Sequence, residues 1–129
     1  MKIFVVEDDA YKREEITEYL DKNNIEYEVG EYVNPALRYI VANKEKICGI
    51  ILDLGLQRAP GINDFNLYGG LDIVNELNRK KIDIPILINS STEVDMLEVY
   101  PSVFGQKFEL NDYEVLDNFI SFLRQSEEQ

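Results

Sequence analysis

Short apolar runs alternate with longer stretches of helical periodicity along the chain. Brief apolar runs bounded by polar or turn residues are typical of buried strands, and apolar positions three and four residues apart are typical of amphipathic helices. The run at 47–52 is apolar on both alternations, as expected for a central parallel strand covered on both faces. The pattern predicts strands at 2–6, 26–33, 47–52, 84–88 and 102–108, helices at 10–22, 71–80 and 92–99, and two further helices that start near residues 34 and 111.

Helix-start signals support several of these boundaries. Asn34 followed by Pro35 is typical of an N-cap and a first helical turn, and Asn111 with Glu114 three residues later is typical of a capping box. Asp9 stands immediately before the first helix, so we interpret it as a helix cap rather than as a functional acid.

Five strands alternating with five helices predict a parallel sheet with helices on both faces. We expect an α/β, flavodoxin-like doubly wound sheet of five parallel strands in the order 2-1-3-4-5. Residues 1–126 would form this single domain, and 127–129 a polar tail. In this order the first and third strands are neighbours where the strand order reverses. Ligands of such folds bind there, outside the carboxyl ends of the strands.

Charge narrows the classes of partner. The chain has 129 residues, with 13 Lys and Arg against 25 Asp and Glu, which gives a net charge of −12 at pH 7. A chain this acidic is repelled by nucleic acid and by anionic membranes at long range, so we expect it to bind neither directly. Its apolar runs are too short for a signal peptide or a membrane span, which predicts a cytoplasmic location.

Two residue counts exclude further chemistry. The chain has no histidine, which excludes histidine bases, histidine metal ligands and phosphohistidine within it. Its single cysteine, Cys48, cannot form an internal disulfide. Because Cys48 lies in an apolar run, we expect a buried structural thiol rather than a reactive one.

Acidic residues follow two strands that the predicted order makes neighbours. Glu7, Asp8 and Asp9 follow the first strand, and Asp53 ends the third. Like charges this close disfavour each other's ionisation, and a divalent cation relieves that repulsion. Carboxylate oxygens suit Mg²⁺, and aspartate carboxylates form aspartyl-phosphate intermediates. The pattern therefore predicts a magnesium site beside a carboxylate nucleophile.

Two polar residues at the ends of later strands have two interpretations each. The Ser90 hydroxyl could donate to a phosphoryl oxygen, but Glu93 three residues later fits a capping box equally well. The Lys107 ammonium could stabilise a phosphoryl group, or it could be a solvated surface lysine. The residues alone leave both alternatives open.

Taken in chain order, these segments resemble the receiver domain of two-component response regulators over essentially the whole sequence. The first strand with its acidic pair, the third strand with its aspartate, and the fourth and fifth strands each match the family's pattern. The matching segments are IFVVEDD at 3–9, IILDLGL at 50–56, IPILINSS at 84–91 and FGQK at 104–107. The resemblance implies a stand-alone receiver whose output passes through a partner protein.

The resemblance also implies site roles. Asp53 would be the phosphoacceptor, and phosphoryl transfer to it would depend on Mg²⁺. The phosphoryl donor would be a histidine kinase, a phosphotransfer protein or a small phosphodonor. The chain would then be no enzyme beyond assisting its own phosphorylation and dephosphorylation. The implied metal ligands are Glu7, Asp8, Asp53 and the backbone carbonyl of Gly55, with Asp8 favoured over Glu7 as the direct ligand.

A conformational switch is part of the same resemblance. The phosphoryl group on Asp53 would draw in the Ser90 hydroxyl and the Lys107 ammonium, and the ring of Phe104 would turn inward. These movements would bias a protein-interaction surface between two states, which a downstream protein partner would read.

Three features depart from the family's pattern. Gly61 has the family's spacing for a helix-starting glycine, but the helical pattern begins only after Gly70, so 57–68 is a predicted insertion. Phe108 replaces the proline that usually follows the lysine. We expect a trans bond there, because a cis bond before a non-proline residue costs about 2.5–4 kcal/mol. The stretch 90–107 is short, which predicts a stunted helix.

Other functions stay open at this point. A pseudo-receiver would use the same fold as a constitutive protein-interaction module without phosphorylation, and the three departures favour it. A phosphohydrolase with an aspartyl nucleophile usually carries a second Asp two residues later, where this chain has Gly55. Flavin binding is disfavoured by the acidic turn after the first strand, since a phosphate needs donors at that place.

Overall fold

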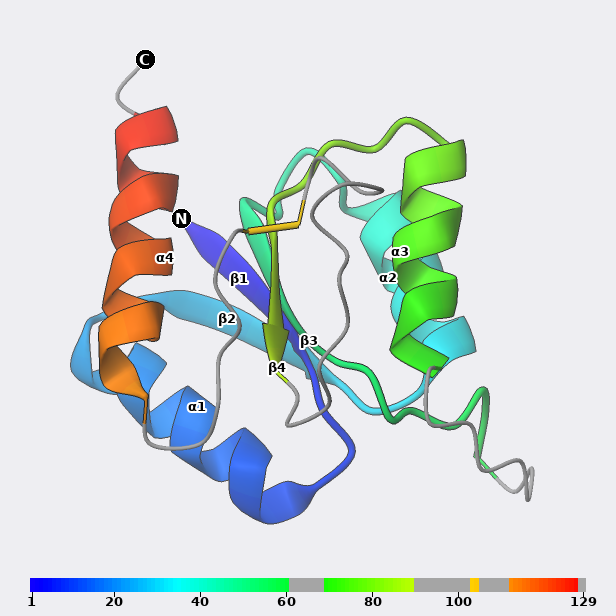
Figure 1. Ribbon diagram of the computed structural model, residues 1–129, viewed down its shortest axis with the longest axis horizontal. Coiled ribbons are helices and arrows are strands. Elements are labelled where there is room, and N and C mark those ends of the chain that lie inside the picture. Colours follow the sequence, from blue (N-terminus) through cyan, green and yellow to red (C-terminus); the bar gives the residue numbers. More distant parts are fainter. Residues whose placement is uncertain (61–68, 90–102, 105–111, 128–129) are drawn as a thin grey trace.

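Three layers make up the structure, in which one parallel β-sheet lies between pairs of helices (Figure 1). The computed structural model describes residues 1–60, 69–89, 103–104 and 112–127. The predicted α/β class, with parallel strands and helices on both faces, is confirmed.

The sheet pairs four parallel strands in the order β2-β1-β3-β4. This is the order predicted for the first four strands, and it makes β1 and β3 neighbours. The carboxyl ends of β1 and β3 therefore meet at one edge of the sheet. The strands are β1 (Lys2–Val6), β2 (Glu26–Gly30), β3 (Gly49–Asp53) and β4 (Ile86–Asn89).

One pairing lies where the fifth strand is predicted to begin. Val103 forms an isolated parallel bridge with Ile86, and the Phe104 N–H donates to the Ile86 carbonyl over 2.7 Å. Ile86 pairs with β3 on its other side, so Val103 lies along the outer edge of β4. This is the place that the order 2-1-3-4-5 gives to strand five. Residues 105–111, which contain most of that predicted strand, lie outside the described residues.

The described helices cover both faces of the sheet (Figure 1). Helices α2 and α3 pack on one face, and α1 and α4 pack on the other. None of these helices is long and apolar enough to cross a bilayer. The helix predicted at 92–99 lies outside the described residues. The helices are α1 (Ala10–Lys22), α2 (Val33–Ala42), α3 (Gly69–Arg79) and α4 (Tyr113–Glu127), so the first residue of the predicted tail is helical.

Alternating strand residues fill two hydrophobic cores. Ile50 and Leu52 of β3 pack with α2 and α3, whereas Ile51 between them packs with α1 and α4. All three side chains are fully buried, and burying each one contributes roughly 1.5–3 kcal/mol relative to leaving it exposed. The continuous apolar run of this strand thus follows from helices covering both of its faces.

Cys48 lies just before β3 and is half-buried rather than buried as predicted. Its Sγ–H donates to the Lys2 carbonyl over 3.2 Å, and burial raises the pKa of the thiol. A protonated, hydrogen-bonded thiol is a poor nucleophile, which agrees with the predicted structural role.

Helix α2 begins at Val33, so the prediction of Asn34 as its N-cap is wrong. The cap position is Tyr32, whose side chain makes no capping hydrogen bond. Instead, the N–H groups of Val33 and Asn34 donate to the carbonyls of Gln57 and Arg58, over 2.9 Å each. The first N–H groups of a helix need partners from outside it, and the segment after β3 supplies them. These bonds also tie that segment to α2.

Two glycines bring the start of α3 against the end of β3. The Gly70 N–H donates to the Leu54 carbonyl over 2.8 Å. A Cβ on Gly70 would lie 2.2 Å from the Asp53 carbonyl oxygen, and a Cβ on Gly69 would lie 2.0 Å from that of Leu56. Only glycine allows backbones to approach this closely. Both glycines belong to the first turn of α3, whereas the apolar pattern placed them before the helix.

Candidate functional site

Three polar residues line up across the carboxyl ends of neighbouring strands. Val6 pairs with Leu52, so Glu7 and Asp53 come next on their chains, and Asp53 pairs with Asn89 of β4. Because side chains alternate between the faces of a sheet, Glu7, Asp53 and Asn89 share the side that α1 and α4 cover. The topology therefore brings together residues from three separate parts of the sequence.

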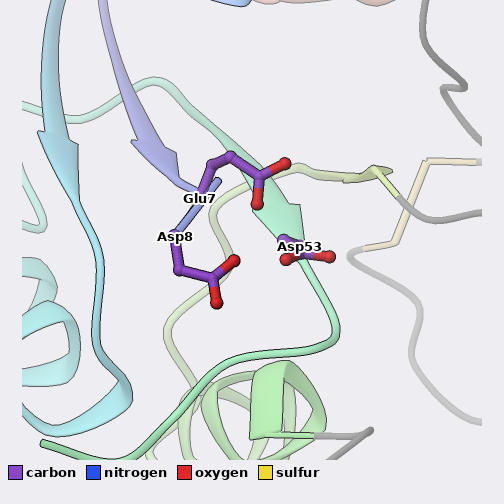
Figure 2. Close-up of side chains that lie close together, drawn as sticks. All are labelled: Glu7, Asp8 and Asp53. Carbon is purple, nitrogen blue, oxygen red and sulfur yellow. The ribbon is translucent and has the colours of Figure 1, made fainter. Parts of the chain in front are cut away.

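Glu7, Asp8 and Asp53 form a group that we call the carboxylate cluster (Figure 2). One carboxylate oxygen from each residue lies within 4.8 Å of those from the other two. Glu7 is buried, Asp53 is half-buried and Asp8 is exposed. Figure 2 shows the three side chains around a shared space at the ends of β1 and β3. The structure thus places together the three acids that the sequence predicts as neighbours.

Glu7 is the innermost member of the carboxylate cluster, with 1% of its surface exposed. The Asn89 Nδ2–H donates to Glu7 Oε1 over 3.0 Å. Glu7 Oε2 is buried and has no hydrogen-bond partner among the described residues. Burial, and then the neighbouring Asp53 carboxyl, raises the pKa of Glu7 to about 9. Without a cation, burial and Asp53 thus favour the protonated form of Glu7.

The other two acids are more accessible. Partial burial, and then the charge of Asp53, raises the pKa of Asp8. The Gly55 N–H donates to Asp53 Oδ1 over 3.3 Å. A Cβ on Gly55 would lie 4.0 Å from Asp53 Oδ2, its nearest contact, so a small side chain would fit at position 55. The backbone therefore holds one oxygen of the half-buried Asp53 carboxylate.

The donor atoms of the carboxylate cluster fit a hard divalent cation such as Mg²⁺. Its donor atoms are carboxylate oxygens, and the buried Glu7 Oε2 lacks a donor within the described part of the chain. Mg²⁺ is usually bound by one or two carboxylates and keeps several waters, and the exposed Asp8 leaves one side accessible to them. Burial and then mutual repulsion raise the pKa of Glu7 and Asp8, and a cation among these oxygens would oppose both causes by stabilising the ionised forms.

Two residues near the start of α1 support the carboxylate cluster from outside. Asp9 Oδ1 accepts from two N–H groups of α1, over 2.9 and 3.2 Å, which confirms its interpretation as a helix cap. Arg13 Nη1 donates to the Glu7 backbone carbonyl over 3.0 Å and lies 3.2 Å from the Glu31 carboxylate. Both residues thus fix the backbone that carries the cluster.

Phe104, the predicted aromatic switch residue, packs on α4. Its half-buried ring has its centroid 5.3 Å from that of Phe119 and 5.5 Å from that of Phe122. The ring therefore connects the outer edge of β4 with α4. Ser90 and Lys107 lie outside the described residues, so their roles stay predictions.

Asn89 is the site residue that the sequence pattern does not reveal. Its side chain is 5% exposed and bonds to Glu7. The available signal is an amide at the end of a strand that is buried at every position, in register with Asp53. A polar residue in such a place needs a partner, but the sequence does not say which one.

The sequence matches no protein-family model and no curated protein. Among solved structures, the chain is similar to the BeF3-activated N-terminal receiver domain of RstA from Klebsiella pneumoniae. The two share 24% identity over 96% of this chain and 99% of that one, with a TM-score of 0.73. The response regulator TrrA from Thermotoga maritima, in complex with Mg²⁺ and BeF, shares 22% identity over 95% and 97% of the chains, with a TM-score of 0.73. TrrA in complex with the histidine kinase ThkA matches at 23% identity over the same shares, with a TM-score of 0.69.

These similarities extend over nearly the whole of each chain. At such low identity they establish the fold alone. The chain has the α/β fold of response regulator receiver domains.

Proposed function

We propose that this chain is a phosphoacceptor receiver of two-component signalling, in which Asp53 takes up a phosphoryl group with Mg²⁺ bound. The carboxylate cluster carries this proposal, because it joins a partly accessible aspartate to a buried glutamate oxygen that lacks a donor among the described residues. The receiver fold supports it, and TrrA, which has that fold, was solved with Mg²⁺ and BeF.

Asp53 is the nucleophile in this proposal. One of its carboxylate oxygens attacks the phosphorus of the donor, a P–O bond forms, and the bond from phosphorus to the donor atom breaks with its electron pair leaving on the donor. The Gly55 N–H orients the carboxylate through Oδ1, and the Asp53 side chain is half-buried, so it is partly accessible to a donor. Glu7, Asp8 and Asp53, with the Gly55 carbonyl, would hold the cation. Bound Mg²⁺ offsets the negative charge of the phosphoryl group.

The proposed phosphoryl donor is a histidine kinase or a phosphotransfer protein, and TrrA in complex with a histidine kinase supports this choice. In the phosphorylated state, Ser90 and Lys107 would contact the phosphoryl oxygens, and the Phe104 ring would turn inward. The ring packs against Phe119 and Phe122 of α4, so its movement would alter the α4 surface. A downstream protein partner would read that change.

One observation favours the pseudo-receiver as a second candidate. Burial and the Asp53 carboxyl raise the pKa of Glu7, and a protonated Glu7 lowers the repulsion within the carboxylate cluster while still accepting from Asn89. A chain that stayed in this state would offer the same fold as a constitutive protein-interaction module.

The two candidates differ in covalent phosphorylation. We would incubate the protein with Mg²⁺ and acetyl phosphate, record its intact mass, and treat Asp53→Asn and Asp83→Asn in the same way. Asp83 is an exposed acid outside the cluster. The receiver predicts one added phosphoryl group on the wild type and on Asp83→Asn, and none on Asp53→Asn.

A folded wild type that gains no phosphoryl group and binds neither Mg²⁺ nor beryllofluoride would contradict the receiver and support the pseudo-receiver. Phosphorylation that persists in Asp53→Asn would place the acceptor elsewhere and contradict the assigned site.

A further inference from the structure

Asn89 and Glu7 connect two strands that do not pair with each other. In the sheet, β3 lies between β1 and β4, and two strand spacings amount to roughly 9.5 Å. The Asn89 Nδ2–H nevertheless donates to Glu7 Oε1 over 3.0 Å. The two side chains therefore meet over the end of β3, where Asp53 stands in register with Asn89.

This hydrogen bond distinguishes the two oxygens of Glu7. Both residues are buried, with exposed fractions of 5% for Asn89 and 1% for Glu7. A buried hydrogen bond to a carboxyl group is stronger than an exposed one, because water does not compete for the partners. Oε1 is held by the amide, and Oε2 is left without a partner among the described residues. The bond thus gives the Glu7 carboxyl a defined orientation.

A role in packing alone explains Asn89 poorly. The other residues of β4 are buried and apolar, and an apolar side chain would avoid the cost of burying an amide. The amide instead donates to a member of the carboxylate cluster. The position of Asn89 is therefore better explained by its contact with the carboxylate cluster than by the packing of β4.

We propose that Asn89 is a positioning residue of the metal site, which holds Glu7 Oε1 so that Oε2 is available to the cation or to one of its waters. The inference rests on the proposed function and adds to it a contact from β4. Hydrogen-bond partners of metal-ligating groups typically contribute 10–100-fold to metal affinity.

The test is a double-mutant cycle read by Mg²⁺ titration calorimetry. Asn89→Leu has a similar size and no donor, and we expect it to weaken Mg²⁺ binding by about tenfold or more. In a Glu7→Gln background the same substitution should change Mg²⁺ affinity little, because its effect passes through Glu7. At saturating Mg²⁺, Asn89→Leu should recover its rate of phosphorylation by acetyl phosphate.

Two further variants separate positioning from folding. Ile88 precedes Asn89 in the sequence and packs in the core that α2 and α3 cover. Ile88→Val should therefore lower the melting temperature and leave Mg²⁺ affinity unchanged. Asn89→Thr suits a strand and is too short to reach Glu7, so it should reproduce the loss of affinity if Asn89→Leu does not fold.

Equal Mg²⁺ affinity of the wild type and a folded Asn89 variant would overturn the positioning role while the proposed function stands. An equal loss in the Glu7→Gln background would also overturn it, because the effect would not pass through Glu7. A wild type that binds no Mg²⁺ would overturn the proposed function and this inference together.

Discussion

Carboxylates gather in two regions of the molecule, and different chemistry holds them in place. Between α1 and α4, the Tyr113 hydroxyl donates to Glu15 Oε1 over 2.7 Å, and the Tyr19 hydroxyl donates to Asp117. The two tyrosine rings stack with their centroids 5.9 Å apart. In the carboxylate cluster, by contrast, three acids face one another, and the side-chain donor found among the described residues is the Asn89 amide.

The groups whose pKa is raised differ between the two regions. Between the helices they are the tyrosines. Burial and then Asp117 raise the pKa of Tyr19, and the hydrogen bond to Glu15 raises the pKa of Tyr113. In the carboxylate cluster they are the acids themselves, because the pKa of both Glu7 and Asp8 is raised. A high count of acidic residues therefore does not mark a site. Burial of acids against one another, with few donors, does.

The carboxylate cluster also depends on a backbone contact, and breaking it should have the largest effect. In Gly70→Ala the new Cβ would lie 2.2 Å from the Asp53 carbonyl oxygen, so either α3 or the end of β3 must move. We expect the free energy of unfolding to fall by about 3 kcal/mol or more. Urea denaturation measures this change.

Gly55→Ala is the matched control, because its Cβ would meet nothing closer than 4.0 Å. It should cost well under half as much stability as Gly70→Ala. Similar losses in the two variants would show that the close approach of α3 to β3 is not what makes Gly70 necessary for stability.

The next largest effect is a dependence of the free energy of unfolding on pH, which we expect from the carboxylate cluster and not from the tyrosines between α1 and α4. The pKa of Glu7 is about 9 in the folded protein and about 4.3 in the unfolded chain. The folded state therefore binds more protons, and the stability that Glu7 contributes is fully present below about pH 4 and is lost as pH rises through 9. Without Mg²⁺, we expect the free energy of unfolding to fall by at most about 1.4 kcal/mol per pH unit in this window.

Glu7→Gln should flatten that slope, because glutamine keeps the shape of the protonated acid and does not ionise. Mg²⁺ at ten times its Kd should restore about 1.4 kcal/mol to the wild type near pH 8. Tyr113→Phe should keep the wild-type slope. Denaturation curves across this pH range, with and without Mg²⁺, measure all three, and a slope in Glu7→Gln equal to that of the wild type would refute the role of Glu7.

Much of the fold could be predicted, because the period of apolar positions depends on local geometry. The bounds expected for β1 and α1 match those observed, and the order of the first four strands followed from the helix–strand alternation. The start of α2 could not be predicted in this way. Its first N–H groups bond to the carbonyls of Gln57 and Arg58, which lie far along the chain and carry no local signal.

The residues of the site also fall into those that the sequence could predict and one that it could not. Glu7, Asp8 and Asp53 could be predicted as neighbours, because they stand at the ends of strands that the topology places side by side. Asn89 could not, since its partner Glu7 is 82 positions away and lies across an intervening strand. Residues whose role depends on a side chain reaching past its neighbouring strand are visible only in the structure.

The variant with the smallest predicted effect tests whether the tyrosines between α1 and α4 are independent of the carboxylate cluster. Tyr19→Phe removes the hydroxyl that bonds to Asp117 and keeps the ring that stacks on Tyr113. We expect a loss of about 1 kcal/mol in the free energy of unfolding, the usual size for one hydrogen bond, with no change in Mg²⁺ affinity or in phosphorylation by acetyl phosphate. Calorimetric Mg²⁺ titration of this variant decides the point. Weaker Mg²⁺ binding would mean that the packing of α1 on α4 influences the strand ends, and the two groups of carboxylates would then have to be treated as one coupled system.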